Sequence, residues 1–145
     1  MIDAHLVADI HTAEACELTA YTDSEGFWTI GWGHLLGNLQ SWKGHTITQF
    51  QADAQCGIDI LSAQHFAQGL PEWCMLDTPC RQNALTELCF NLRGKWYAFH
   101  ETRAALQRQD WQGAHDGLLH SLWASEVGPT RSNRLANYFL TGQYP

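Results

Sequence analysis

Residues 14–36 read EACELTAYTDSEGFWTIGWGHLL, and this stretch decides how the fold is interpreted. Its middle, Asp23-Ser24-Glu25-Gly26, is a typical turn sequence, because Asp and Ser side chains bond nearby backbone groups and glycine tolerates positive φ. The run that follows, FWTIGW at residues 27–32, is rich in the β-branched and aromatic residues that favour strands. The stretch therefore predicts a β-hairpin or small meander over residues 17–36.

Two carboxylates flank this predicted hairpin. Glu14 precedes its first strand, Asp23 opens its turn, and Thr29 lies on the strand after the turn. Glycoside hydrolysis uses two carboxyl groups, one to donate a proton and one to activate a water molecule or stabilise positive charge. The pattern therefore indicates glycosidase chemistry, while a purely structural turn aspartate and strand threonine remain the alternative.

The rest of the chain predicts helices. A short helix is expected over residues 3–13, and a long one over 48–68 begins at a capping box of Thr48 and Gln51. Thr78 and Pro79 start a helix that runs to residue 92. Further helices are expected at 100–108, at 111–122 with Asp110 as its cap, and from 128–130 to 140. In the long helix, apolar residues recur at helical spacing on one face: Ile47, Phe50, Ala54, Ile58 and Leu61.

The charge and the cysteine content of the chain argue against two kinds of function, nucleic-acid binding and metal binding. Residues 1–80 hold one Lys and ten Asp or Glu (net −9), and residues 81–145 hold seven Lys or Arg and five acids (net +2), matching the total of −7. This acidic balance argues against nucleic-acid binding. The five Cys are odd in number and show no zinc-ligand spacing, so we expect buried free thiols and no metal site.

The segment TIGWGHLL at residues 29–36, with Glu14 and Asp23 in register, resembles the active-site hairpin of the phage-type lysozymes, glycoside hydrolase family 24. The resemblance extends over nearly the whole chain, through KGHTIT at 43–48, FN at 90–91 and FLTG at 139–142. It implies an α+β, lysozyme-like fold forming one domain over residues 1–145. A small β-hairpin lobe (about 14–47) and a long connecting helix (about 48–68) would lead to a helical lobe. That larger lobe (about 69–145) would include the N-terminal helix, and the substrate cleft would lie between the lobes.

The resemblance also implies the reaction. The chain would be a muramidase that hydrolyses the β-1,4 bond between N-acetylmuramic acid and N-acetylglucosamine in peptidoglycan, with no cofactor or metal. Glu14 would be the general acid, Asp23 its partner carboxylate, and Thr29 the residue that holds the attacking water in an inverting reaction. Other family positions are expected to line the glycan cleft or to form a supporting ion pair: Leu35, Phe90, Thr102 and Gly117 in the cleft, and His34 with Asp59 in the pair.

Several expectations concern the surroundings of the reaction. Residues 1–5 lack the features of a signal peptide, so we expect the chain to stay in the host cytoplasm until a holin or similar protein opens the membrane to the periplasmic wall. A monomer is expected. Trp28, Trp32 and Trp42 are candidates for stacking on sugars, and Arg131 and Arg134 for contacting murein carboxylates or bridging the lobes. A lytic transglycosylase and a non-catalytic murein-binding module remain the alternatives.

Overall fold

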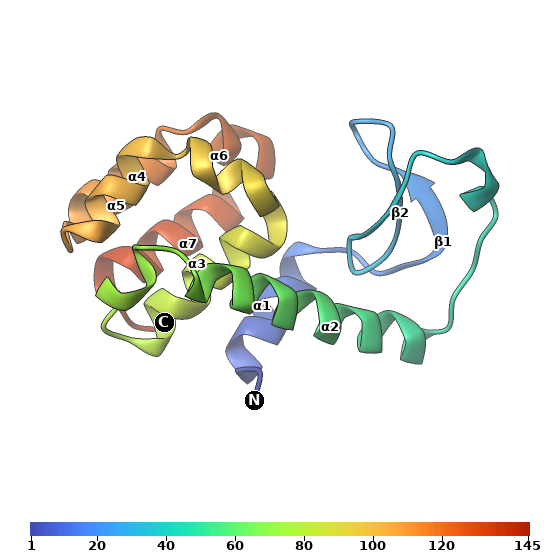
Figure 1. The fold of residues 1–145 in the computed structure, drawn as a ribbon, viewed down its shortest axis with the longest axis horizontal. Helices are drawn as coiled ribbons and strands as arrows, with labels where there is room; N and C mark the ends of the chain where they lie inside the picture. Colours follow the sequence, from blue (N-terminus) through green and yellow to red (C-terminus); the bar gives the residue numbers. More distant parts are fainter. The chain divides into compact units, whose positions relative to one another are not determined.

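The computed structural model describes residues 1–145 and confirms an α+β chain, with seven α-helices and one three-stranded antiparallel sheet (Figure 1). Its contacts divide the chain into two compact units, Met1–Ser62 and Ala63–Pro145, called here the first and second units. The elements are α1 (Ala4–Ala13), β1 (Glu17–Thr22), β2 (Trp28–Gly31), β3 (His34–Gly37), α2 (Gln49–Gln68), α3 (Pro79–Leu92), α4 (His100–Gln107), α5 (Trp111–Leu119), α6 (Leu122–Val127) and α7 (Pro129–Thr141).

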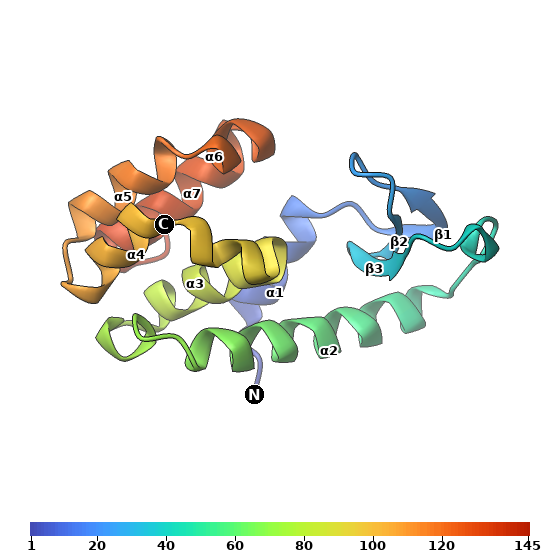
Figure 2. The same cartoon turned by 45° about the horizontal axis from the view of Figure 1, so that its top comes forward.

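The sheet of the first unit is the predicted meander, with strand order β1-β2-β3 (Figure 2). Thr29, on the central strand, is paired with Tyr21 on one side and with Leu35 on the other. Directly opposed residues of antiparallel strands project to the same face. Tyr21, Thr29 and Leu35 therefore form one row across a single face of the sheet, called here the Thr29 row.

Helix α1 ends at Glu14 for a local reason. Its start is capped by Asp3, which accepts a hydrogen bond from the His5 amide at 2.8 Å. At the other end the Glu14 amide still donates to the Ile10 carbonyl at 2.8 Å, while the Glu14 backbone is already extended, with φ −105° and ψ 126°. The chain therefore leaves the helix at Glu14 and enters the sheet three residues later.

Helix α2 begins at the predicted capping box. The Gln51 amide donates to Thr48 Oγ1 at 3.1 Å, and Gln51 Oε1 accepts from the Thr48 amide at 2.9 Å. The apolar face expected from spacing is not the buried face, however. Phe50, Ile58 and Leu61 are 81%, 60% and 50% exposed, whereas other, mostly smaller side chains are buried along another face of the helix: Ala52, Cys56, Ile60, Ala63 and Ala67.

Small residues on a helix allow closer packing than Phe or Leu, and both faces of α2 carry apolar residues. Spacing alone therefore could not identify the buried face.

The second unit packs its helices around one apolar cluster that includes Leu85, Leu88, Trp96, Leu106 and Phe139. The predicted caps at Thr78 and Asp110 are present, accepting from the amides of Arg81 at 3.2 Å and Gly113 at 2.9 Å. The single helix expected over 111–122 is wrong at its end, because α5 stops at Leu119 and α6 was missed. Ser121 caps α6 through the Ala124 amide at 3.3 Å, which a continuous helix would not permit.

Two buried carboxylates organise the second unit. Glu72 is 0% exposed and accepts hydrogen bonds from Trp96 Nε1 at 2.7 Å, Arg103 Nε at 2.8 Å and Gln107 Nε2 at 3.3 Å. The hydrogen bond to Glu72 is the largest influence that raises the pKa of Arg103. These contacts tie the loop before α3 to α4.

The second buried carboxylate is Glu87, on α3. It pairs with Arg131 Nε at 3.0 Å and with both terminal nitrogens of Arg134 at 2.9 Å. These ion pairs were not foreseen from the sequence, and the roles expected for the two arginines, murein contact or bridging between the lobes, stay predictions. In the structure both arginines bind a carboxylate of their own unit.

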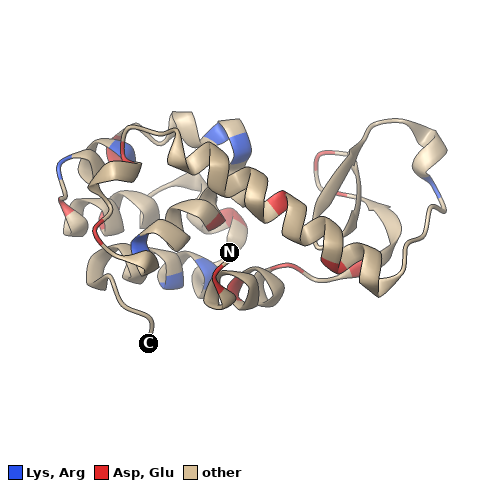
Figure 3. Ribbon diagram, turned by 60° about the horizontal axis from the view of Figure 1, so that its bottom comes forward, with Lys and Arg blue, Asp and Glu red and all other residues tan.

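The distribution of charge between the two units and the burial of the cysteines can be compared with the expectations from the sequence. Lys and Arg lie mainly in the second unit, and the first unit has Lys43 as its single Lys or Arg (Figure 3). None of the five cysteines is in a disulfide, but only Cys56, Cys80 and Cys89 are buried; Cys16 is partly buried and Cys74 is exposed, so the expectation of buried thiols is wrong for these two. Burial is the main cause that raises the pKa of Cys56 and of Cys89 to about 12. None of the helices combines the length and the apolar character needed to cross a bilayer.

Candidate active site

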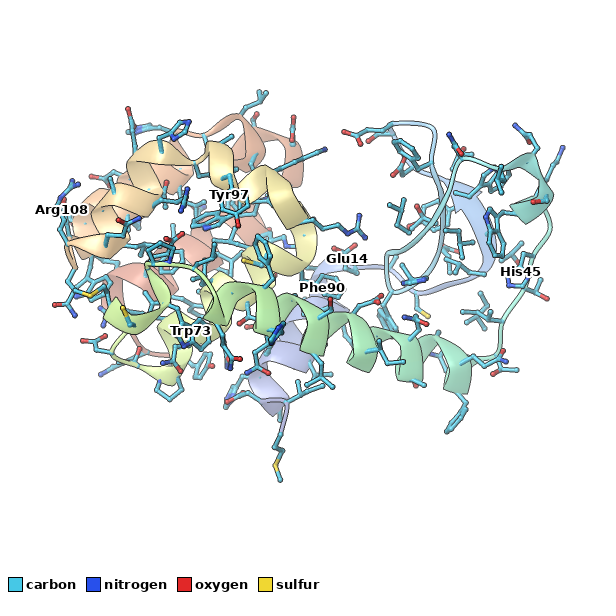
Figure 4. All side chains as sticks on the ribbon, viewed as in Figure 1. Glu14, His45, Trp73, Phe90, Tyr97 and Arg108 are labelled. Atoms are coloured by element: carbon cyan, nitrogen blue, oxygen red, sulfur yellow. The ribbon has the colours of Figure 1, made fainter.

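The Glu14 carboxylate packs against a glycine of the sheet. Glu14 is partly buried at the end of α1 (Figure 4), and a Cβ atom at Gly33 would lie 3.2 Å from Glu14 Oε2. Gly33 has φ +76°, a conformation that residues with a side chain rarely adopt. The β2–β3 turn thus comes close to the carboxylate because residue 33 has no side chain.

The two carboxylate oxygens of Asp23 have different surroundings. Oδ1 accepts hydrogen bonds from the amides of Glu25 and Phe27, each at 2.9 Å, and so forms the Asx turn that the sequence suggested. Oδ2 takes part in none of these turn bonds. The structural and catalytic interpretations of Asp23 are therefore compatible, because one oxygen holds the turn and the other is left for a ligand.

The hydroxyl of Thr29 is oriented by its own strand. Thr29 is 5% exposed, and its Oγ1 donates a hydrogen bond to the Phe27 carbonyl at 3.3 Å. Because the hydroxyl hydrogen is used in this way, the oxygen can act only as an acceptor toward a further partner. An acceptor at this position suits a bound water molecule, which has two hydrogens to donate.

Tyr21 interacts with all three predicted catalytic residues, by strand pairing with one and electrostatically with the other two. It is paired with Thr29 across β1 and β2. Burial raises the pKa of its phenol, and the charges of Glu14, Glu17 and Asp23 raise it further. One phenol thus lies within electrostatic reach of both proposed catalytic carboxylates and beside the threonine. Tyr21 therefore connects the three residues, through strand pairing with Thr29 and through the electrostatic influence of Glu14 and Asp23.

An unforeseen contact fixes the end of α1. The His11 ring, one turn before Glu14, stacks on Trp32 with centroids 3.8 Å apart and planes 5° apart. Trp32 Nε1 donates to Asp53 Oδ1 at 2.8 Å, and Gln49 Nε2 donates to the same oxygen at 2.8 Å. This hydrogen bond from Trp32 is the largest influence that lowers the pKa of Asp53.

Trp32 was expected among the sugar-stacking aromatics, but its ring is stacked on His11 within the chain.

The supporting pair and the cleft position Leu35 lie in the first unit, and the other three predicted cleft positions lie in the second unit. In the first unit, His34 Nδ1 lies 2.7 Å from Asp59 Oδ2, joining β3 to α2. In the second unit, Thr102 is 2% exposed, and a Cβ at Gly117 would lie 3.0 Å from its Oγ1. Phe90 is partly buried against the apolar core. Little of Thr102 can be reached by a ligand, and the roles of Leu35, Phe90, Thr102 and Gly117 remain predictions.

No group of three or more His, Cys, Asp or Glu side chains is arranged to hold a metal ion. Two carboxylates and a threonine around an antiparallel hairpin are a set of groups suited to a glycoside hydrolase. A family model described as phage lysozyme matches residues 11–136, and the chain belongs to this phage lysozyme family. It is thus a peptidoglycan-hydrolysing glycosidase of the lysozyme type.

Gly33→Ala tests the contact with Glu14. We expect the variant to lose roughly 1–2 kcal/mol of stability from the positive φ. We also expect about tenfold or more lower lysis activity, because the new methyl group displaces the Glu14 carboxylate. Thermal unfolding and turbidity loss of purified sacculi measure the two effects.

Gly44→Ala is the matched control for Gly33→Ala. Gly44 has φ +80° but nothing within 4 Å of the added Cβ, so it should lose similar stability and keep its activity. Equal activity in the two variants would contradict the proposed contact.

Proposed function

We propose that the chain is a muramidase that cleaves the β-1,4 bond between N-acetylmuramic acid and N-acetylglucosamine, with Glu14 as general acid and Asp23 and Thr29 as the water-holding pair. The observation that carries the proposal is that only one of the two carboxylate oxygens of Asp23 is used by the turn. Its Oδ1 is used by the amides of Glu25 and Phe27, and Oδ2 is outside the turn bonds. A carboxylate held rigidly by one oxygen presents the other at a fixed position.

In the proposed reaction, the Glu14 carboxyl group donates its proton to the glycosidic oxygen as the bond from that oxygen to the anomeric carbon breaks. Positive charge develops on the sugar ring, and a water molecule attacks the anomeric carbon from the opposite face. Asp23 accepts one hydrogen of this water, and the Thr29 oxygen accepts the other as a hydrogen bond. The products are a new reducing end and a free 4-hydroxyl group, and the enzyme is restored when Asp23 releases the proton it took from the water to solvent and Glu14 regains a proton from solvent.

Attack by water on the face opposite the leaving group inverts the configuration. The proposal therefore includes an inverting reaction that gives the α-anomer first. Support comes from Thr29, whose hydroxyl hydrogen is committed to the Phe27 carbonyl, so that its oxygen faces a ligand as an acceptor. A retaining enzyme would instead need a carboxylate that bonds directly to the anomeric carbon.

A lytic transglycosylase is the second candidate within the same substrate class. It would use Glu14 alone, and the sugar's own 6-hydroxyl group would attack in place of water. The oriented hydroxyl of Thr29 and the Asp23 oxygen outside the turn bonds favour hydrolysis, since neither residue is needed for the intramolecular attack.

Product analysis tests the proposal. Purified Gram-negative sacculi would be incubated with the protein, the new reducing ends labelled with borohydride, and the muropeptides analysed by mass. Labelled muramic acid ends support a muramidase, labelled glucosamine ends would make the chain a glucosaminidase, and unlabelled anhydro ends a transglycosylase. NMR of the first products distinguishes the α- from the β-anomer.

The biological role we propose is that of an endolysin, which digests the periplasmic wall of the host once a holin-type protein has opened the membrane. We propose that it acts as a monomer. Expression of the chain with and without a membrane-permeabilising partner tests the role, because lysis should require both proteins. Lysis by the chain alone would overturn the dependence on a partner.

A further inference from the structure

Tyr21 has no role in the proposed reaction, although it is paired with the proposed water-binding residue Thr29. The register of the sheet pairs Tyr21 with Thr29 and Thr29 with Leu35. The three side chains of the Thr29 row therefore project from one face, with neighbours about 4.5–5.5 Å apart at their Cβ atoms. Tyr21 and Leu35 flank the threonine on its two sides.

Exposure differs along this row. Thr29 is 5% exposed, whereas Tyr21 and Leu35 are 36% and 37% exposed. The two outer side chains thus stand above the central one. A sugar whose anomeric carbon faces the water on Thr29 would have the phenol of Tyr21 on one side and the apolar side chain of Leu35 on the other.

The chemistry of Tyr21 makes it a donor at neutral pH. Burial, followed by the charges of Glu14, Glu17 and Asp23, raises the pKa of its phenol above 10, so the hydroxyl keeps its hydrogen. The phenol makes no hydrogen bond within the chain. A partly exposed donor of this kind gains a hydrogen-bond partner when a ligand binds over the Thr29 row.

We propose that Tyr21 contacts the substrate, donating a hydrogen bond from its phenol to a neutral oxygen of the sugar held over Thr29, and so positions that sugar for attack. The proposal rests on the proposed muramidase function. A neutral hydroxyl or acetamido oxygen is the acceptor, rather than the lactyl carboxylate of muramic acid. Glu14, Glu17 and Asp23 already place negative charge around the phenol, and a further anion there would be repelled.

Tyr21→Phe removes the hydroxyl and keeps the ring. With soluble glycan strands as substrate, we expect kcat/KM to fall about 3- to 10-fold, mainly through a higher KM, since the hydrogen bond forms when the sugar binds. The thermal midpoint should match that of the wild type. Sedimentation with sacculi should show weaker binding by the same factor.

Tyr97→Phe is the matched control, because Tyr97 is an exposed tyrosine of the second unit, outside the Thr29 row (Figure 4). It should leave KM and kcat unchanged. Unchanged KM, kcat and sacculus binding in Tyr21→Phe would overturn the role of Tyr21, as would a loss of activity that merely follows a lower thermal midpoint. Absence of new reducing ends with the wild type would instead overturn the muramidase proposal, and the sacculus-binding comparison would still test the contact.

Discussion

Glu14→Gln should lower the release of reducing ends from sacculi by on the order of 10³-fold, which is the largest effect we expect on activity. The amide has nearly the shape of the carboxyl group and can keep the packing against Gly33. It cannot donate a proton to the glycosidic oxygen, so bond cleavage loses its acid. Initial rates of reducing-end formation by wild type and variant, at equal protein concentration, measure the effect.

Glu17→Gln is the matched control for this experiment. Glu17 is an exposed carboxylate at the start of β1, three residues from Glu14, and it too influences Tyr21 electrostatically. We expect its activity to stay close to that of the wild type, because no step of the proposed reaction uses it. If Glu14→Gln kept a wild-type rate, Glu14 would not be the general acid.

Glu72→Ala should lower the free energy of unfolding by about 3 kcal/mol, the largest stability loss we expect from a single substitution. The substitution leaves Trp96 Nε1 without an acceptor in the core and separates Arg103 from its carboxylate at 2.8 Å. Unsatisfied donors that remain buried carry their full desolvation cost. Urea-induced unfolding followed by tryptophan fluorescence measures the loss, and the thermal midpoint should fall by roughly 10 °C.

Glu126→Ala provides the comparison for Glu72→Ala. Glu126 is exposed on α6, so replacing it should change the unfolding free energy by less than about 0.5 kcal/mol. Equal stability of the two variants would mean that the hydrogen-bond network of Glu72 contributes nothing net. Both proteins should hydrolyse sacculi normally at temperatures where they are folded, since neither residue belongs to the proposed site.

Local chemistry made the hairpin and the helix starts predictable. Asp23 and Gly26 specify the turn, and Thr48, Thr78 and Asp110 begin helices through side-chain hydrogen bonds to residues two or three positions away. Such interactions involve neighbours in sequence, so they can be inferred without knowing the tertiary structure.

The features that the sequence did not reveal depend on distant residues. Spacing on α2 marked Phe50, Ile58 and Leu61 as one face but could not show which face is covered. The stack of Trp32 on His11 joins residues 21 positions apart, and the pairing of Arg134 with Glu87 joins residues 47 apart. No local pattern distinguishes an arginine that binds a carboxylate of its own unit from one that binds substrate.

Asp23 uses Oδ1 for the turn and leaves Oδ2 outside it. A substitution that changes only Oδ2 would therefore keep the turn and alter the group proposed to accept a hydrogen from water. Asparagine at position 23 keeps an acceptor oxygen for both turn amides and replaces the other oxygen with a donor group. One nucleotide change from GAT or GAC to AAT or AAC makes this replacement. Under the proposed mechanism, in which Asp23 accepts a hydrogen of the attacking water, this lysozyme would lie one mutational step from a folded wall-binding protein without hydrolytic activity.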